Sequence, residues 1–72
     1  MCSKKQTEFA IFIIHRLAQV WHKQPNEVFH ILQSTHILDD YIIAHYYVLH
    51  TLGEQYLVED ISEFARERGA VL

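Results

Sequence analysis

The chain of 72 residues has little of what usually cross-links or interrupts a protein, with one cysteine, one proline and two glycines. Because Cys2 is the lone cysteine, no disulfide can form within the chain, and such cysteine usage is typical of a reducing compartment. We interpret Cys2 as part of a frayed terminus rather than as a reactive thiol. Without a linker-like or low-complexity stretch, residues 1–72 are expected to form one domain.

Basic residues and long hydrophobic runs are also scarce. Nine acidic residues outnumber six lysines and arginines, so the formal net charge is −3, whereas proteins that bind nucleic acid usually carry a basic stripe. The apolar run at residues 9–14 is too short for a secretory signal, and no run approaches the roughly 20 residues that span a bilayer. These absences predict a soluble, cytoplasmic protein.

Hydrophobic residues, in contrast, make up half of the chain, which excludes a disordered protein. Their spacing predicts two helices in the first half. The first covers about residues 4–22, with Ser3 and Gln6 as a capping box at its start. The second covers about residues 25–33, because Pro25 suits the first position of a helix.

Two further helices are expected in the second half. A third helix covers about residues 39–52, and Gly53 ends it in the left-handed conformation. The last helix begins either near residue 52 or at Asp60, which forms a capping box with Glu63, and it ends at Gly69. The sequence therefore predicts an all-α fold, a compact bundle of three to four short helices.

The first and third helices are apolar over most of their circumference, so we expect part of that surface to contact another chain. Aromatic residues with a polar tip are enriched at such interfaces. Core packing is the alternative for each aromatic residue, and His50 can instead lock the corner after the third helix. The candidate partner-binding residues are Trp21, Tyr41, Tyr47, His50 and Tyr56.

Catalysis and cofactor binding have little support in this sequence. A nucleophilic serine, threonine or cysteine needs a positioned base and a third group that orients the base, and no spacing in the chain suggests such a set. No glycine-rich loop is available to hold a phosphate group. We therefore expect a protein that is not an enzyme and has no cofactor.

The histidines suggest a metal site as one alternative. No two of them lie at the i, i+4 spacing that places two ligands on one face of a helix. A site built from His36, Asp39 or Asp40 and His50 would require the fold to bring them together. The six histidines are His15, His22, His30, His36, His45 and His50.

A helix-turn-helix regulator associated with DNA is the other alternative, because residues 25–33 and 39–52 have the layout of this motif. The recognition helix would begin with Asp39 and Asp40, and it contains no lysine or arginine. Its N-terminal residues would face a groove lined with phosphates. The electrostatics therefore oppose this interpretation.

Residues 38–42, Tyr46, residues 49–53 and residues 56–61 together resemble a small uncharacterised bacterial family. This domain of unknown function has chains of similar size and a pattern close to L-D-Y-I, a tyrosine, L-H-T-x-G and Y-x-V-x-D-I. The chain departs from it at Asp39-Asp40, where the family commonly has one acidic residue, and at Leu52, where the family is often polar. The family defines no catalytic residue.

Members of this family are often encoded beside proteins that resemble ADP-ribosyltransferases. The resemblance thus implies an antitoxin-like or accessory role. Together with the wide apolar helix faces, it leads us to expect a non-catalytic protein-protein interaction module. Its partner would be another protein chain, either a second copy or the product of a neighbouring gene, in a homo-oligomer or a hetero-complex.

Overall fold

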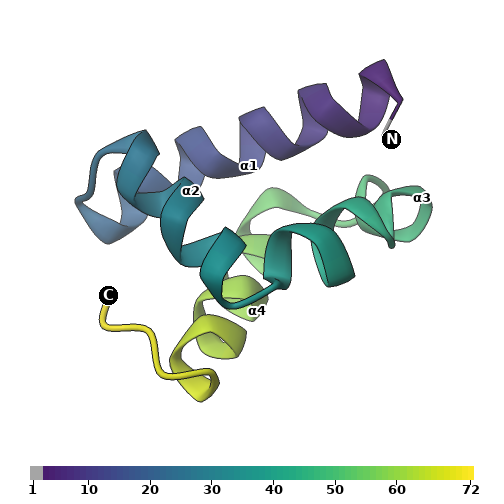
Figure 1. The fold of residues 1–72 in the computed structure, drawn as a ribbon. Coiled ribbons are helices and arrows are strands. Elements are labelled where there is room, and N and C mark those ends of the chain that lie inside the picture. Colours follow the sequence, from purple (N-terminus) through teal and green to yellow (C-terminus); the bar gives the residue numbers. More distant parts are fainter. Residues whose placement is uncertain (1–2) are drawn as a thin grey trace.

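The computed structural model describes residues 3–72, and this part of the chain consists of helices joined by short connections, without a strand (Figure 1). The prediction of an all-α fold is confirmed, whereas the interpretation of Cys2 lies outside the described residues. The five helical segments are α1 (Lys4–Trp21), α2 (Pro25–Ser34), the π-helix η1 (Leu38–Ile43), α3 (Tyr46–Leu49) and α4 (Glu54–Glu67).

Helix α1 begins at the capping box predicted from the sequence. The Gln6 amide N–H donates to Ser3 Oγ at 3.3 Å, and the Ser3 amide N–H donates to Gln6 Oε1 at 2.7 Å. At the other end, His22 ends the helix with φ 56° and ψ 45°. This left-handed conformation is usually taken by glycine or asparagine, and histidine is among the residues that tolerate it.

Helix α2 also has the bounds that its sequence suggested. Pro25 is its first residue, and the Glu27 carboxylate accepts a hydrogen bond from the Gln24 amide at 3.0 Å. After Ser34 the chain turns, and His36 takes a second left-handed conformation with φ 62°. The two long regular helices of the first half are therefore both followed by a left-handed histidine.

The single helix expected over residues 39–52 is wrong in detail, because it is divided into η1 and α3. His45 leaves the helical region with φ −109° and ψ 23°. β-branched and aromatic side chains lower the intrinsic preference for an uninterrupted helix. A tertiary contact is found at this division, where Gln6 Nε2 donates a hydrogen bond to the carbonyl oxygen of Ile43 at 3.0 Å.

In the second half of the chain, the structure corrects the prediction for Gly53 and the predicted cap at Asp60. Gly53 is extended, with φ −66° and ψ 145°, and it precedes α4 instead of ending a helix in the left-handed region. Because α4 begins at Glu54, Asp60 and Glu63 lie inside the helix and form no cap. Gly69 has φ 92° and follows the end of α4, as the sequence predicted.

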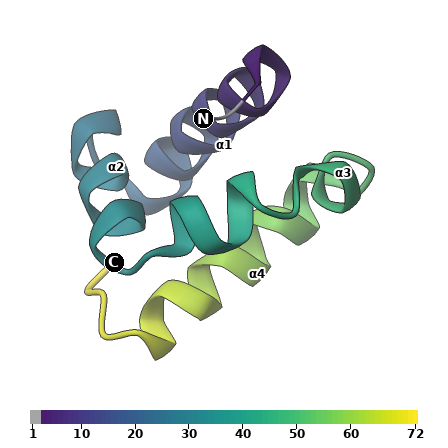
Figure 2. The same cartoon turned by 45° about the vertical axis from the view of Figure 1, so that its right-hand side comes forward.

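The core lies where α1, α2, η1 and α4 meet, and Figure 2 shows η1 lying next to α4 while the C-terminal tail returns toward α2. No helix in the described part of the chain is long and apolar enough to span a membrane. The largest fully buried side chains are Ile13, Leu17, Leu32, Ile37, Ile42, Leu57, Ile61 and Val28.

Candidate interaction surface

Exposed apolar side chains gather in one short stretch after η1. Within residues 3–72, nine large hydrophobic side chains are exposed, and four of them lie in the ten residues 47–56. The segment from Tyr41 to Gly53 contains no aspartate, glutamate, lysine or arginine. We define the 47–56 surface by the exposed side chains and their exposed fractions: Tyr47 (76%), Val48 (62%), Leu52 (38%) and Tyr56 (55%).

A cluster of aromatic rings supports this surface from below. Tyr46 is half-buried and contacts Phe9 of α1 edge to face, with 5.4 Å between ring centroids. The Tyr46 ring also lies 5.4 Å from the Tyr47 ring and stacks on the His50 ring at 4.6 Å. Tyr46 is therefore the centre of the cluster, although it was not among the candidate partner-binding residues predicted from the sequence. Only the fold brings Phe9 next to it.

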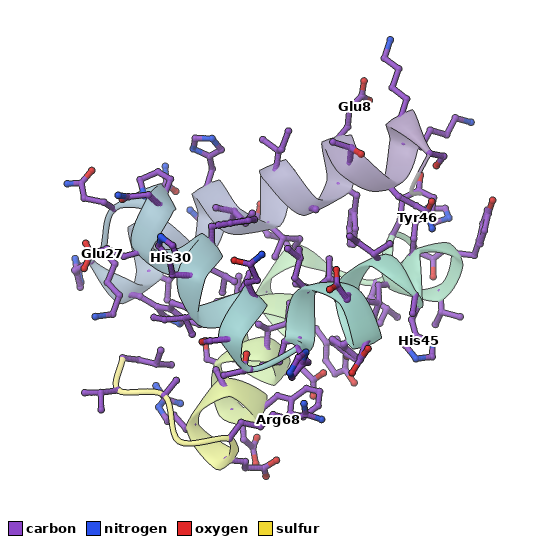
Figure 3. The ribbon with its side chains drawn as sticks, in the orientation of Figure 1. Glu8, Glu27, His30, His45, Tyr46 and Arg68 are labelled. Carbon is purple, nitrogen blue, oxygen red and sulfur yellow. The ribbon has the colours of Figure 1, made fainter. Side chains whose placement is uncertain are left out.

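His45 and Tyr46 are adjacent in the chain but serve different neighbours. Figure 3 shows Tyr46 on the side of the segment that faces α1, whereas His45 points away from α1. The His45 ring lies 6.0 Å from the ring of Tyr41 in η1. At the break in the helix, the Tyr46 ring therefore contacts α1 and the His45 ring contacts η1.

His50 has the corner position that the sequence predicted. It follows the last residue of α3, its amide N–H donates to the Tyr46 carbonyl oxygen at 3.0 Å, and its ring is stacked on Tyr46. The side chain is exposed. The stack holds the exit of α3 in place, and one face of the imidazole stays accessible from outside.

Tyr41 is held inside the molecule more firmly than the other tyrosines of the candidate set. Its hydroxyl donates to the Asp60 carboxylate, and its ring contacts the Phe64 ring edge to face at 5.5 Å. Burial, reinforced by the hydrogen bond to the negatively charged Asp60, raises the pKa of Tyr41 well above its usual value. The tyrosine therefore remains a neutral donor and joins η1 to α4.

Trp21 lies in the core, so core packing accounts for this candidate. Its exposed fraction is 7%, and its Nε1–H donates to Ser62 Oγ at 2.7 Å across the contact between α1 and α4. Ser62 in turn donates to the Val58 carbonyl oxygen at 2.6 Å. A buried indole N–H needs such an acceptor, and one sequence could not reveal which serine would supply it.

Two hollows flank α4 on opposite sides. The first, of about 330 Å³, is lined by Phe64 and three carboxylates. The guanidinium of Arg68 lies 4.4 Å above the Phe64 ring centroid, and its Nη1 donates to the Thr35 carbonyl oxygen at 2.6 Å. Arg68 thus fastens the end of α4 to the end of α2. The carboxylates of this hollow belong to Asp60, Glu63 and Glu67.

The second hollow, of about 320 Å³, lies between α1 and α4. Arg16 and Glu54 form an ion pair here with 2.8 Å between Nε and Oε2. The Arg16 Nε atom is buried, and its N–H does not point along this contact as a hydrogen bond would. Because both side chains are about 40% exposed, the pair contributes little to stability.

The two alternative functions gain no support from the arrangement of side chains. No group of three histidine, cysteine, aspartate or glutamate residues in the described part of the chain lies close enough to hold a metal ion. Asp39 and Asp40 are both exposed at the start of η1. In the helix-turn-helix alternative these carboxylates would approach the phosphate backbone.

The fold and this surface define a small all-α domain with an exposed face that is apolar and partly aromatic. A family model described as a protein of unknown function (DUF3791) matches residues 8–68, and the chain belongs to this family. No curated protein and no solved structure was found to match the chain. Membership confirms the domain of unknown function that the sequence resembled, and it brings no activity with it.

Proposed function

We propose that the chain is a non-catalytic protein-protein interaction module of the cytoplasm, and that it binds its partner through the 47–56 surface. One observation carries this proposal. Tyr47 and Val48 are adjacent, 76% and 62% exposed, and lie in a segment without formal charge. Contiguous exposed apolar side chains mark interaction sites, and tyrosine is enriched at their centres.

The energetic case follows from what a partner would cover. Fully burying a valine or leucine side chain contributes about 1.5–3 kcal/mol, and a few well-buried residues usually dominate the affinity of an interface. The Tyr46 ring, which is stacked on His50, contacts the Tyr47 ring and restricts its movement. An anchor that is already fixed loses less conformational entropy when it binds.

The partner remains a proposal based on the family resemblance. A neighbouring-gene product that resembles an ADP-ribosyltransferase would make the chain an antitoxin-like or accessory subunit. Such a role requires no catalytic residue, because covering a surface of the partner is sufficient to inhibit, hold or direct it. A second copy of the chain is the other occupant that this function allows.

The test is capture of binding partners by the full chain at native expression levels, with identification by mass spectrometry. Val48→Asp places a charge on the 47–56 surface. Val71→Asp makes the same change at another exposed valine, with an exposed fraction of 85%, in the C-terminal tail. Circular dichroism checks that both variants fold.

We expect one stoichiometric protein that the Val48→Asp variant loses and the Val71→Asp variant retains. If only the chain itself is recovered, as an oligomer sensitive to Val48→Asp, the module binds a second copy. A folded monomer without any partner, or a partner equally retained by both variants, would contradict the proposal.

A further inference from the structure

Charge is divided unevenly between the two halves of the chain. Residues 1–38 contain four basic and two acidic residues, with a formal net charge of +2. Residues 39–72 contain two basic and seven acidic residues, with a formal net charge of −5. The 47–56 surface belongs to the acidic half. Its occupant must therefore tolerate, or use, a strongly negative neighbourhood.

The acidic residues continue the exposed apolar face along α4. Tyr56 is 55% exposed and lies one helical turn before Asp60. Residues at i, i+4, i+7 and i+11 follow one side of a helix, so Glu63 and Glu67 extend the same stripe. Asp60, Glu63 and Glu67 line the hollow of about 330 Å³ together with Phe64, and Tyr56 precedes them on the same side of the helix. We call these five residues the α4 seam.

Ring contacts connect the α4 seam to the rest of the 47–56 surface. Val48 lies almost one turn after His45, whose ring is 6.0 Å from Tyr41. Tyr41 contacts the Phe64 ring at 5.5 Å and donates to Asp60. A chain of ring contacts through His45, Tyr41 and Phe64 thus links the start of α3 to the α4 seam.

The carboxylates of the seam have no cation of their own. The ion pairs within the described residues join Lys4 to Glu8 and Arg16 to Glu54, away from the seam. Arg68 lies next to the hollow, but its guanidinium is used by the Phe64 ring and by a backbone carbonyl oxygen. The three carboxylates of the seam therefore form no ion pair within the described residues, and they outnumber the one guanidinium beside them.

We infer that the segment which docks on this face is cationic: an apolar stretch of a partner protein, followed by lysine or arginine residues that meet Asp60, Glu63 and Glu67. This inference depends on the proposed function and names its partner by chemistry. A second copy is the less suitable occupant, because a symmetric dimer places the same patch against itself. In such a dimer, residues 39–72 of the two copies, each with a formal net charge of −5, would face each other.

The test is titration of the full chain, labelled with ¹⁵N, with a synthetic helical peptide that has leucines at one end and lysines at the other. A peptide in which glutamate replaces each lysine serves as the control probe. The variant Glu63→Gln with Glu67→Gln removes two charges from the seam. The variant Glu8→Gln with Glu59→Gln removes two charges elsewhere, since Glu59 lines the opposite hollow.

We expect amide shifts along α4 and residues 45–48 with the lysine peptide and none with the glutamate peptide. Loss of two exposed charge pairs should weaken binding by about fivefold in the seam variant and by less than about twofold in the control variant. Equal weakening in both variants would show that net charge alone attracts the peptide, and it would overturn the inference, as would the absence of any shift.

The captured partner separates this inference from the proposed function. If the partner is lost with Val48→Asp but retained with Glu63→Gln and Glu67→Gln, the interaction module stands and the cationic docking segment is wrong. If a sedimentation experiment shows a dimer that Val48→Asp dissociates, the second copy replaces the cationic segment. If Val48→Asp changes nothing, the proposed function itself fails.

Discussion

Residues 3–34 and residues 38–53 are both rich in apolar side chains, yet the chain folds them differently. The first region forms two regular helices that are capped at their starts and buried along one side. The second forms a π-helix, a break at Ala44 and His45 and a helix of four residues. The regular helices form where caps and burial favour the same structure, whereas the second region has no side-chain cap at the start of either helix.

The exposed side chains show the same contrast. In α1, buried side chains recur along one side from Ala10 to the end of the helix, namely Ala10, Ile13, Leu17, Ala18 and Trp21. In α3, Leu49 is buried while Tyr47 and Val48 are exposed. The first region also exposes apolar side chains, but only by 38–50%, whereas Tyr47 and Val48 of the second region are 76% and 62% exposed and offer more apolar surface to a partner. The exposed apolar side chains of the first region are Ile11, Phe12, Val20 and Phe29. Each of the following variants tests one side of this division.

The largest expected effect is that of Trp21→Ala. Removing a buried tryptophan usually costs about 3–5 kcal/mol, and here Ser62 also loses the N–H that it accepts at 2.7 Å. Urea unfolding followed by circular dichroism measures the change. Tyr47→Ala, at a residue that is 76% exposed, should change the free energy of unfolding by less than about 0.5 kcal/mol. Similar losses in both variants would refute the division.

The contrast between the two regions also shows how much of the fold could be predicted from the sequence. Helical periodicity and caps correctly predicted α1, α2 and the stop at Gly69, because those signals are local. The start of α4 at Glu54 agrees with one of the two starts that the sequence allowed. The π-helix and the extended Gly53 were not predicted, and the end of the π-helix is held by a contact between distant residues, that of Gln6 with Ile43. Sequence alone could not show this contact.

The candidate residues divided for the same reason. Each has an apolar ring and a polar tip, so the pattern could not say which would find a buried hydrogen-bond partner. The fold supplied Ser62 to Trp21 and Asp60 to Tyr41, and it left Tyr47 and Tyr56 exposed. Tyr46 could not be recognised as the central ring, because its neighbour Phe9 is far away in the sequence.

Tyr41→Phe should have an intermediate effect, because it removes a hydrogen bond to a charged group while the ring contacts remain. We expect the free energy of unfolding to fall by about 1.5 kcal/mol at neutral pH. Since the pKa of Tyr41 is raised in the folded protein, this contribution is fully present below the unfolded pKa of about 10 and declines as pH rises above it.

Urea unfolding of both proteins between neutral and strongly alkaline pH measures this difference. The gap between the wild-type chain and Tyr41→Phe should be constant up to about pH 10 and should narrow above it. The comparison of the two proteins isolates the contribution of the Tyr41 hydroxyl. A gap that stays constant or widens above that pH would show that the hydroxyl does not donate to Asp60 in the folded state.

A smaller gain is expected from His22→Gly. His22 follows α1 with φ 56°, a conformation that costs a residue with a side chain roughly 1–2 kcal/mol. Glycine avoids this cost but loses more entropy on folding, so the net stabilisation should be about 0.5–1 kcal/mol. Thermal unfolding would show a higher midpoint. A lower midpoint would mean that the His22 side chain stabilises the end of α1 in a way the backbone argument omits.

Effects of similar or smaller size should come from the two glycines, which differ in backbone conformation. A Cβ atom at either Gly53 or Gly69 would meet nothing within 4 Å, so packing is equal at both. Gly53 is extended, and Gly53→Ala should stabilise the chain by about 0.5 kcal/mol by restricting the unfolded state. Gly69 has φ 92°, and Gly69→Ala should cost about 1 kcal/mol. Opposite shifts of the thermal midpoint would confirm that Gly53 leads into α4 in an ordinary conformation. Equal losses of stability in both variants would instead indicate that Gly53 takes the left-handed conformation predicted from the sequence for the end of the third helix.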